Sequence, residues 1–257
     1  MADEDTEREA VLDAVENVAT RLAAEKSHLT ELDSAIGDAD HGANMDRGFA
    51  AVVEEIDGMN DASVVEITKT VGMTLVSTVG GASGPLYGGS IMSASAELEE
   101  GITAETAVAF AEAYLEKVKD RGGAQAGAKT MVDALTPAVH TFKKSIEQDD
   151  LPPVEALAKA VDAAERGARF TTPLRAKKGR ASYLGWRSVG HQDPGATSTL
   201  YILEALLEAA EDHLEGGAER NASSPTTPDK SLDGDGGQGG EEHEDGGQGA
   251  GGGAGAE

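Results

Sequence analysis

Three aspartates, Asp33, Asp38 and Asp40, lie within eight residues in the segment LDSAIGDADHGANMDRGF. Carboxylates at this spacing repel one another, so a cation that neutralises them would stabilise the segment. Hard oxygen ligands, in a chain that contains no cysteine, favour Mg²⁺ or Ca²⁺ over zinc or copper. The segment therefore predicts a divalent metal site, with a solvated acidic loop as the alternative.

The spacing of this segment excludes a calcium-binding EF-hand. A loop of that type starting at Asp38 would place Gly42 at its third ligand position and Phe49 at its twelfth, where a glutamate is required. Magnesium instead takes a few carboxylates and completes its shell with water and substrate phosphates. Magnesium is therefore the favoured ion.

Two glycine-containing segments have features of phosphate-binding helix starts. Gly80-Gly81-Ala82-Ser83-Gly84 leads into Pro85, and Asp193-Pro194-Gly195 opens a second helix with Asp193 as its expected N-cap. Glycines let backbone amides approach an anion, and a helix N-terminus favours negative charge. The alternatives are a glycine corner that lets helices cross closely and, at Asp193, a simple cap.

A third segment, Gly122 to Thr130, superficially resembles a Walker A loop. It does not match, because Ala128 separates Gly127 from Lys129 and the preceding residues are expected to form a helix rather than a strand. We therefore reject a P-loop and keep the segment as a candidate nucleotide-facing loop.

A basic cluster stands out in this acidic chain and indicates an anion, most simply a phosphate. Its members are Arg175, Lys177, Lys178, Arg180 and Arg187. Pairing with neighbouring acidic helices is the alternative. His41 and His191 are weaker signals, because either could be a hydrogen-bonded structural histidine.

The remaining pattern predicts an all-α fold, a single helical bundle or barrel. Within the first expected helix, Val11, Val15, Val18 and Leu22 recur at helical spacing. Thr103 and Pro153 are expected near the starts of two others. Eight helices are expected, at residues 7–26, 44–57, 62–79, 85–99, 103–119, 129–147, 153–169 and 194–214.

The chain is strongly acidic, with a formal net charge of −26, which argues against nucleic acid or an anionic membrane as a partner. Residues 215–257 hold ten acidic and two basic residues, so residues 1–214 still carry −18. This acidity suggests adaptation to high intracellular salt, as in a halophile, a hypothesis that thermal unfolding against KCl concentration can test.

Composition also divides the chain into two parts. Residues 1–214 are expected to form the helical domain, and 215–257, rich in Gly, Asp and Glu, a disordered acidic tail without catalytic function. The tail would act as a solubility appendage or a partner-binding segment. The N-terminal sequence MADEDTERE is acidic, unlike a signal peptide, and no run of eighteen apolar residues occurs. A cytoplasmic protein is expected.

Four motifs together carry a family resemblance: D-x₄-D-x-D-H-G-x-N-M, GGASGPLYG, KGRASYLG and GHQDPGATS. In this order and spacing they resemble the nucleotide-binding L subunit of dihydroxyacetone kinases, over about residues 5–212. The resemblance implies an eight-helix antiparallel barrel that holds ADP and two Mg²⁺ ions at one end. The chain departs from the family at Trp186, where many relatives have an acidic residue, and in its tail.

The resemblance also implies roles for individual residues. Asp33, Asp38 and Asp40 would bind Mg²⁺, and His41 and Arg180 would be the catalytic residues. The nucleotide contacts would be His41, Gly42, Ala43, Asn44, Ala82, Ser83, Gly122, Met131, Arg180, Asp193, Pro194 and Gly195.

The implied chemistry is phosphoryl transfer, which depends on positioning and charge neutralisation and needs no covalent nucleophile from this chain. In the family, a histidine of a separate K subunit binds dihydroxyacetone, and a phosphohistidine M subunit rephosphorylates resident ADP. This chain would then be half of an enzyme, and the resemblance leaves open a homodimer. Three alternatives remain: the nucleotide domain of fatty-acid kinases, an Mg²⁺-dependent phosphohydrolase and a non-enzymatic ion-binding scaffold.

Overall fold

The computed structural model describes residues 4–214, 216–217 and 220–221, and every regular element in these ranges is a helix. The all-α prediction is confirmed. The expected count of eight is not reproduced, because the described residues form nine α-helices and two 3₁₀ segments. Their bounds are α1 (Glu4–Ala24), α2 (Lys26–Ile36), α3 (His41–Ile56), α4 (Val64–Thr78), α5 (Ser83–Ala94), η1 (Ser95–Leu98), α6 (Ala104–Gly122), α7 (Val132–Glu147), α8 (Pro153–Phe170), η2 (Arg180–Ser188) and α9 (Pro194–His213).

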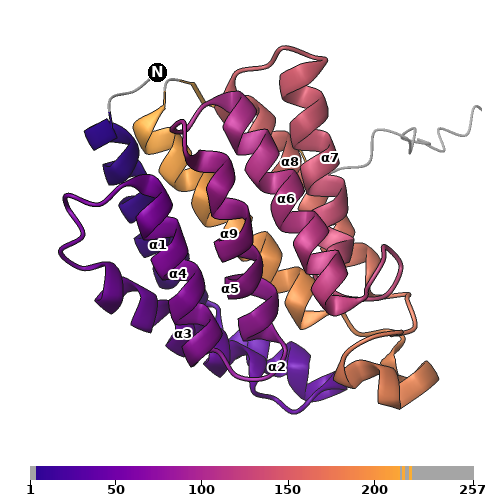
Figure 1. Ribbon diagram of the computed structural model, residues 1–257. Helices are drawn as coiled ribbons and strands as arrows, with labels where there is room; N and C mark the ends of the chain where they lie inside the picture. The colour runs from indigo at the N-terminus through magenta and orange to yellow at the C-terminus, as the bar shows by residue number, and fades with distance from the viewer. Residues whose placement is uncertain (1–3, 215, 218–219, 222–257) are drawn as a thin grey trace, which may run out of the picture. The chain divides into compact units, whose positions relative to one another are not determined.

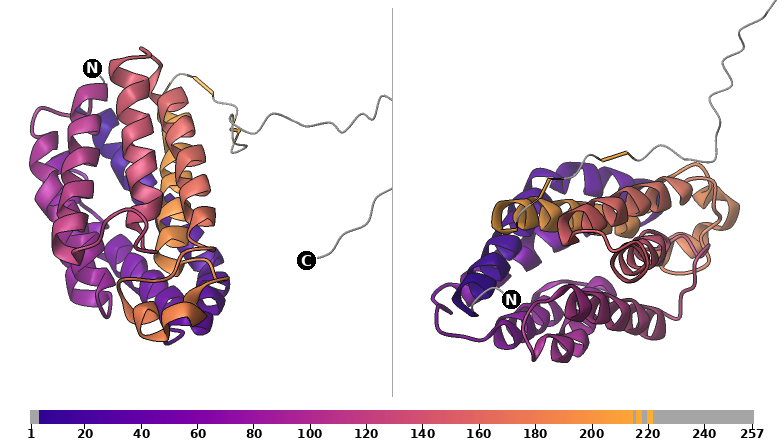
Figure 2. Two further views of the ribbon diagram at one scale, coloured as in Figure 1. Left: turned by 90° about the vertical axis from the view of Figure 1, so that its right-hand side faces the viewer. Right: turned by 90° about the horizontal axis from the view of Figure 1, so that it is seen from above.

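Helices α1 and α3 to α9 surround a common interior (Figures 1 and 2). Helix α1 contacts α3, and each helix from α3 to α8 contacts the next one along the chain. Helix α9 contacts both α8 and α1, which closes the ring. The short helix α2 lies at one end, where it contacts α3, α9 and η2.

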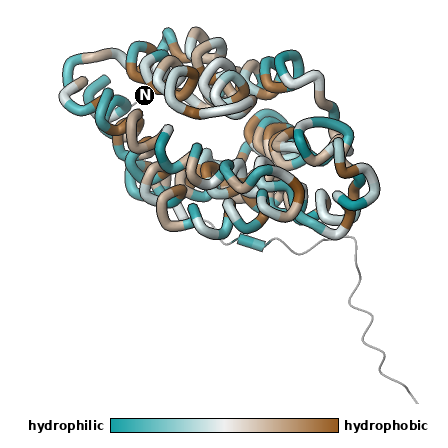
Figure 3. The backbone as a smooth tube through the Cα atoms, turned by 90° about the horizontal axis from the view of Figure 1, so that it is seen from below, coloured by the Kyte–Doolittle hydropathy of each residue, from teal (hydrophilic) through white to brown (hydrophobic). Residues whose placement is uncertain are grey.

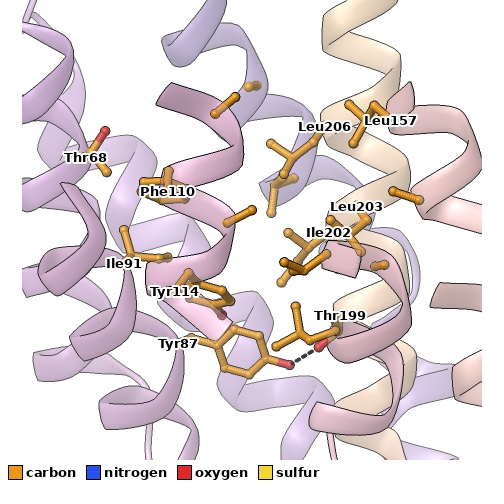
Figure 4. A pocket seen from close by; sticks show the side chains of 18 of the residues that line it. Thr68, Tyr87, Ile91, Phe110, Tyr114, Leu157, Thr199, Ile202, Leu203 and Leu206 are labelled. Atoms are coloured by element: carbon orange, nitrogen blue, oxygen red, sulfur yellow. Dashed lines mark hydrogen bonds between the residues drawn. The ribbon is translucent and has the colours of Figure 1, made fainter. Parts of the chain in front are cut away.

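The interior is apolar, as the helical periodicity requires. Figure 3 shows hydrophobic and hydrophilic positions on the individual helices, viewed from the end of the ring. Val18 and Leu22 of α1 and Leu75 of α4 are among the buried core residues. The core is not filled completely: a cavity of about 380 Å³ between the helices is lined almost wholly by aliphatic and aromatic side chains (Figure 4).

Several predicted helix starts are confirmed. Thr103 caps α6, and its hydroxyl and that of Thr106 each accept from the other's backbone amide. Pro153 is the first residue of α8, and Asp193 caps α9 by accepting from the Ala196 amide at 2.7 Å. Helix α5 begins at Ser83, two residues before the expected start at Pro85.

Helix α2 is the element that the sequence pattern missed. The chain was expected to leave the helical conformation after residue 26, whereas a single residue, Glu25, separates α1 from α2. Leu29, Asp33 and Ile36 are the buried residues of α2. Asp33 thus interrupts the apolar stripe that would have marked this segment as a helix.

No helix within the described part of the chain is both long and apolar enough to cross a lipid bilayer.

Most of the expected tail, residues 215–257, lies outside the described residues, but Arg220 and Asn221 contact the helical ring. The Arg220 guanidinium pairs with Glu165 and Glu204 at 2.9 Å and with Asp162 at 3.2 Å. The Asn221 amide donates to the second oxygen of Asp162 at 2.6 Å. Asp162 is buried, so Arg220 neutralises a carboxylate that water solvates poorly and joins the chain after α9 to α8.

The Arg220 contacts predict where the chain can be shortened. A chain that ends at Asn221 is expected to melt like the full chain, whereas Arg220→Ala should lose about 1–2 kcal/mol, because Asp162 stays buried without its partner. Thermal unfolding checks both, with Lys159→Ala as the control, since Lys159 forms an exposed pair on the same helix α8. An Arg220→Ala chain as stable as the control would show that these contacts do not hold the segment.

Candidate functional site

Four loops meet at the end of the ring where α2 and η2 lie (Figure 1). They connect α2 to α3, α4 to α5, α6 to α7 and α8 to α9. Together with the adjoining helix ends they line a cleft of about 190 Å³. Segments distant in the sequence therefore form one site.

The three aspartates form a cluster on one side of this cleft. One carboxylate oxygen from each of Asp33, Asp38 and Asp40 lies within 4.8 Å of the others. Asp33 is buried in the last turn of α2, whereas Asp38 and Asp40 are exposed in the following turn. Three hard oxygens at this separation fit a divalent cation such as Mg²⁺, with the exposed side left for water or phosphate.

The backbone around the cluster explains how Asp33 is held. Its Oδ2 accepts hydrogen bonds from the amides of Asp40 at 2.9 Å and His41 at 3.1 Å, at the start of α3. A Cβ added at Gly37 would overlap the Asp33 carboxylate, so any larger residue there would displace this side chain. Because α3 begins at His41 rather than at residue 44, its N-terminal end points at the acidic cluster and favours negative charge there.

Arg180 lies beside the cluster at the start of η2. Its guanidinium pairs with Asp38 at 3.0 Å. Farther along η2, the side chains of Tyr183 and Trp186 are 89% and 75% exposed, and the Arg175 guanidinium lies 5.3 Å from the Trp186 ring centroid. The basic segment therefore presents both cations and uncovered aromatic rings next to the cleft.

His41, the first residue of α3, contacts the start of α9. Its Nε2 lies 2.8 Å from Ser198 Oγ, and the ring is buried. Burial lowers the pKa of His41, although the nearby charges of Asp33 and Asp40 oppose the shift. His191 is exposed, and its backbone carbonyl rather than its ring has a structural contact.

Lys129 is a cleft residue that the sequence did not single out individually. Its side chain is almost completely buried, and its Nζ donates to the carbonyls of Thr171, at 2.8 Å, and His191. Burial lowers the pKa of Lys129, against the opposing charges of Asp193 and Asp133. Burial likewise raises the pKa of Asp193 to about 7, despite the Ala196 amide and Lys129. In the sequence, only the glycine-rich segment from Gly122 to Thr130 indicated that Lys129 could lie near a binding site.

The structure brings most of the expected site residues to the cleft. Those that line it are Asp33, Asp38, Asp40, His41, Ala82, Ser83, Met131, Arg180, Asp193, Pro194 and Gly195. The other expected nucleotide contacts, Gly42, Ala43, Asn44 and Gly122, lie outside this lining. The metal, nucleotide and catalytic roles of both groups stay predictions.

Two of these outlying residues have other contacts. A Cβ at Gly42 would overlap the Lys26 carbonyl, so this glycine lets α2 and α3 pack closely. Asn44 accepts from the Arg47 guanidinium at 2.6 Å and lies against Gly80.

The chain is similar in sequence to proteins of one family. Residues 35–208 match the DAK2 domain model. The chain is 45% identical over 193 residues to the PEP-dependent dihydroxyacetone kinase, ADP-binding subunit DhaL, of Escherichia coli K12, covering 74% of this chain and 91% of that relative. It is 42% identical to the PTS-dependent dihydroxyacetone kinase, ADP-binding subunit DhaL, of Lactococcus lactis, covering 73% and 90%.

A solved structure shares the fold. The dihydroxyacetone kinase of C. freundii in complex with AMP-PNP and Mg²⁺ superposes with a TM-score of 0.59 at 27% identity. The match covers 77% of this chain but only 33% of that longer chain. The chain belongs to the DAK2 domain family, and within it to the family of the DhaL-type ADP-binding subunits of dihydroxyacetone kinases.

Proposed function

We propose that this chain is the ADP-binding subunit of a dihydroxyacetone kinase that depends on a phosphocarrier. A phosphoryl group passes from a phosphohistidine on an M subunit, by way of the nucleotide held here, to dihydroxyacetone on a K subunit. The single observation that carries the proposal is the cluster of Asp33, Asp38 and Asp40 at the edge of a cleft that also receives three helix starts. The relatives named as PEP-dependent and PTS-dependent subunits support the phosphocarrier form.

The chemistry of the cleft suits a magnesium-bound nucleotide. Bound Mg²⁺, two ions in this proposal, would neutralise phosphate charge. The start of α5 lies at the cleft, where its backbone amides can donate to phosphate oxygens. Lys178 and Arg180 add positive charge at its edge. The residues of this chain thus bind and orient the phosphates, which is the main requirement of phosphoryl transfer.

The other functions explain less of the site. A fatty-acid kinase domain is less consistent with the relatives, which are named as dihydroxyacetone kinase subunits over about nine-tenths of their length. An ion-binding scaffold needs no glycine-rich helix starts around the cation. A phosphohydrolase would require hydrolysis of the nucleotide by the chain alone.

Calorimetric titration with ADP tests the proposal. The purified chain, stripped of nucleotide, is expected to bind one ADP in the presence of Mg²⁺ and to bind it at least about 100-fold more weakly in EDTA, because the carboxylates then repel the phosphates. Equal affinity in both buffers would contradict the metal assignment. No ADP binding in either would favour the scaffold, and steady release of phosphate from ATP would favour the hydrolase.

A further inference from the structure

The hydroxyl of Tyr87 lies where the helix starts of the cleft meet. Tyr87 is buried in α5, one turn after Ser83, and its ring lines both the nucleotide cleft and the apolar cavity. Its Oη reaches Ser198 Oγ at 2.9 Å, the Gly195 carbonyl at 3.1 Å and Thr199 Oγ1 at 3.2 Å, all in the first turns of α9. Figure 4 shows the ring against the cavity and the hydroxyl directed at Thr199.

Ser198 connects this hydroxyl to the start of α3. Its Oγ contacts both Tyr87 and the Nε2 atom of His41, which is the first residue of α3. One chain of hydrogen bonds, Tyr87–Ser198–His41, therefore joins the starts of α5, α9 and α3. Each of these starts contributes residues to the cleft.

The hydroxyl groups of this network have acceptors on α3 and α9. The Ser198 hydroxyl has His41 Nε2 at 2.8 Å and the Gly195 carbonyl at 3.1 Å within reach. The Tyr87 hydroxyl can donate to Ser198 Oγ or to the Gly195 carbonyl, and Thr199 donates to the same carbonyl at 2.8 Å.

From this network we propose that Tyr87 is a positioning residue of the nucleotide site. Its hydroxyl fixes Ser198, which fixes the His41 imidazole and thereby the relative placement of three helix starts that face the phosphates. The effect on ADP binding rests on the proposed function, whereas the hydrogen-bond network does not depend on what the chain binds. Burying a hydroxyl without a hydrogen-bond partner costs free energy. Removing the hydroxyl of Tyr87 or Ser198 should therefore leave the remaining groups of the network less firmly held.

Two tyrosine-to-phenylalanine substitutions distinguish a role of the Tyr87 hydroxyl in positioning His41 from a role of the ring in core packing. Tyr87→Phe removes only the hydroxyl. Tyr114→Phe removes the same group from a neighbouring tyrosine of α6 that lines the same cavity (Figure 4) and has no hydrogen bond to α9 within the described residues. We expect Tyr87→Phe and Ser198→Ala each to weaken Mg²⁺-dependent ADP binding about tenfold, which equals about 1.4 kcal/mol, and Tyr114→Phe to change it less than twofold.

The double variant Tyr87→Phe/Ser198→Ala tests whether the two residues act as one unit. We expect it to bind ADP within about twofold of the weaker single variant, since the network is already broken. In nucleotide-free chains with ¹⁵N-labelled histidine, the ring signals of His41 should move in both single variants but not in Tyr114→Phe. Circular dichroism at the assay temperature confirms that each variant is folded.

The two readouts distinguish failure of this inference from failure of the proposed function. Unchanged His41 signals in Tyr87→Phe, or effects on ADP binding that multiply to about 100-fold in the double variant, would overturn the positioning role. If the unmodified chain binds no ADP, the proposed function fails, and the His41 signals still decide whether the network exists.

Discussion

Replacement of Asp38 by asparagine is expected to abolish magnesium-dependent ADP binding while the helices remain folded. Asp38 supplies one of three clustered carboxylates, and asparagine has nearly the same shape without the charge. Loss of a ligand carboxylate should weaken ADP binding by about 100-fold or more. Asp38 is exposed and lies between α2 and α3, so little core packing depends on it.

The control for this substitution is Asp46→Asn. Asp46 lies nearby on α3 but pairs with Lys26 at 2.8 Å and does not line the cleft. Calorimetry should show near-normal ADP binding in the control and none in Asp38→Asn, with equal helicity in both. An Asp38→Asn chain that purifies with stoichiometric ADP and Mg²⁺ would contradict the metal assignment.

The residues expected to bind metal and phosphate were predictable because each segment has a local signature. The carboxylate spacing, the glycine-rich helix starts and the basic cluster are all visible within a few residues of sequence. The structure places members of all three along one cleft. The four-motif resemblance implied that these segments lie together in one site, whereas composition and periodicity do not predict which segments meet in space.

The sequence patterns did not predict the buried polar residues and their hydrogen-bond partners. Asp33 breaks the apolar stripe of α2, so the periodicity that reveals the other helices fails in the segment that carries the acidic cluster. Tyr87 and Lys129 have partners more than forty residues away, Ser198 for Tyr87 and Thr171 for Lys129. Such pairs depend on tertiary structure, and a single sequence contains no sign of them.

The chain alone is expected to produce no dihydroxyacetone phosphate from Mg²⁺, ATP and dihydroxyacetone. The charged groups of the cleft suit phosphates, whereas a small neutral ketone needs a pocket with convergent polar groups. The larger cavity does not provide one, because its lining is almost entirely apolar. Coupled detection of the product, with a complete dihydroxyacetone kinase as positive control, should show background rates only.

Addition of a K subunit and a phosphorylated M subunit should restore transfer. We propose that the K subunit docks on the exposed side chains of Arg175, Tyr183 and Trp186, because exposed aromatic and arginine side chains are typical binding anchors. Trp186→Ala should raise the K-subunit concentration needed for half-maximal transfer and leave ADP binding unchanged. An unchanged requirement for the K subunit would place the docking surface elsewhere.

The most direct test of the relay follows two labels through one reconstituted reaction. The chain is loaded with ¹⁴C-labelled ADP and mixed with the K subunit, dihydroxyacetone, unlabelled ADP in solution and an M subunit that carries ³²P. We expect ³²P to appear in dihydroxyacetone phosphate while ¹⁴C stays bound to this chain over many turnovers. Exchange of ¹⁴C into solution at every turnover, or product formed by this chain without the K subunit, would contradict this expectation.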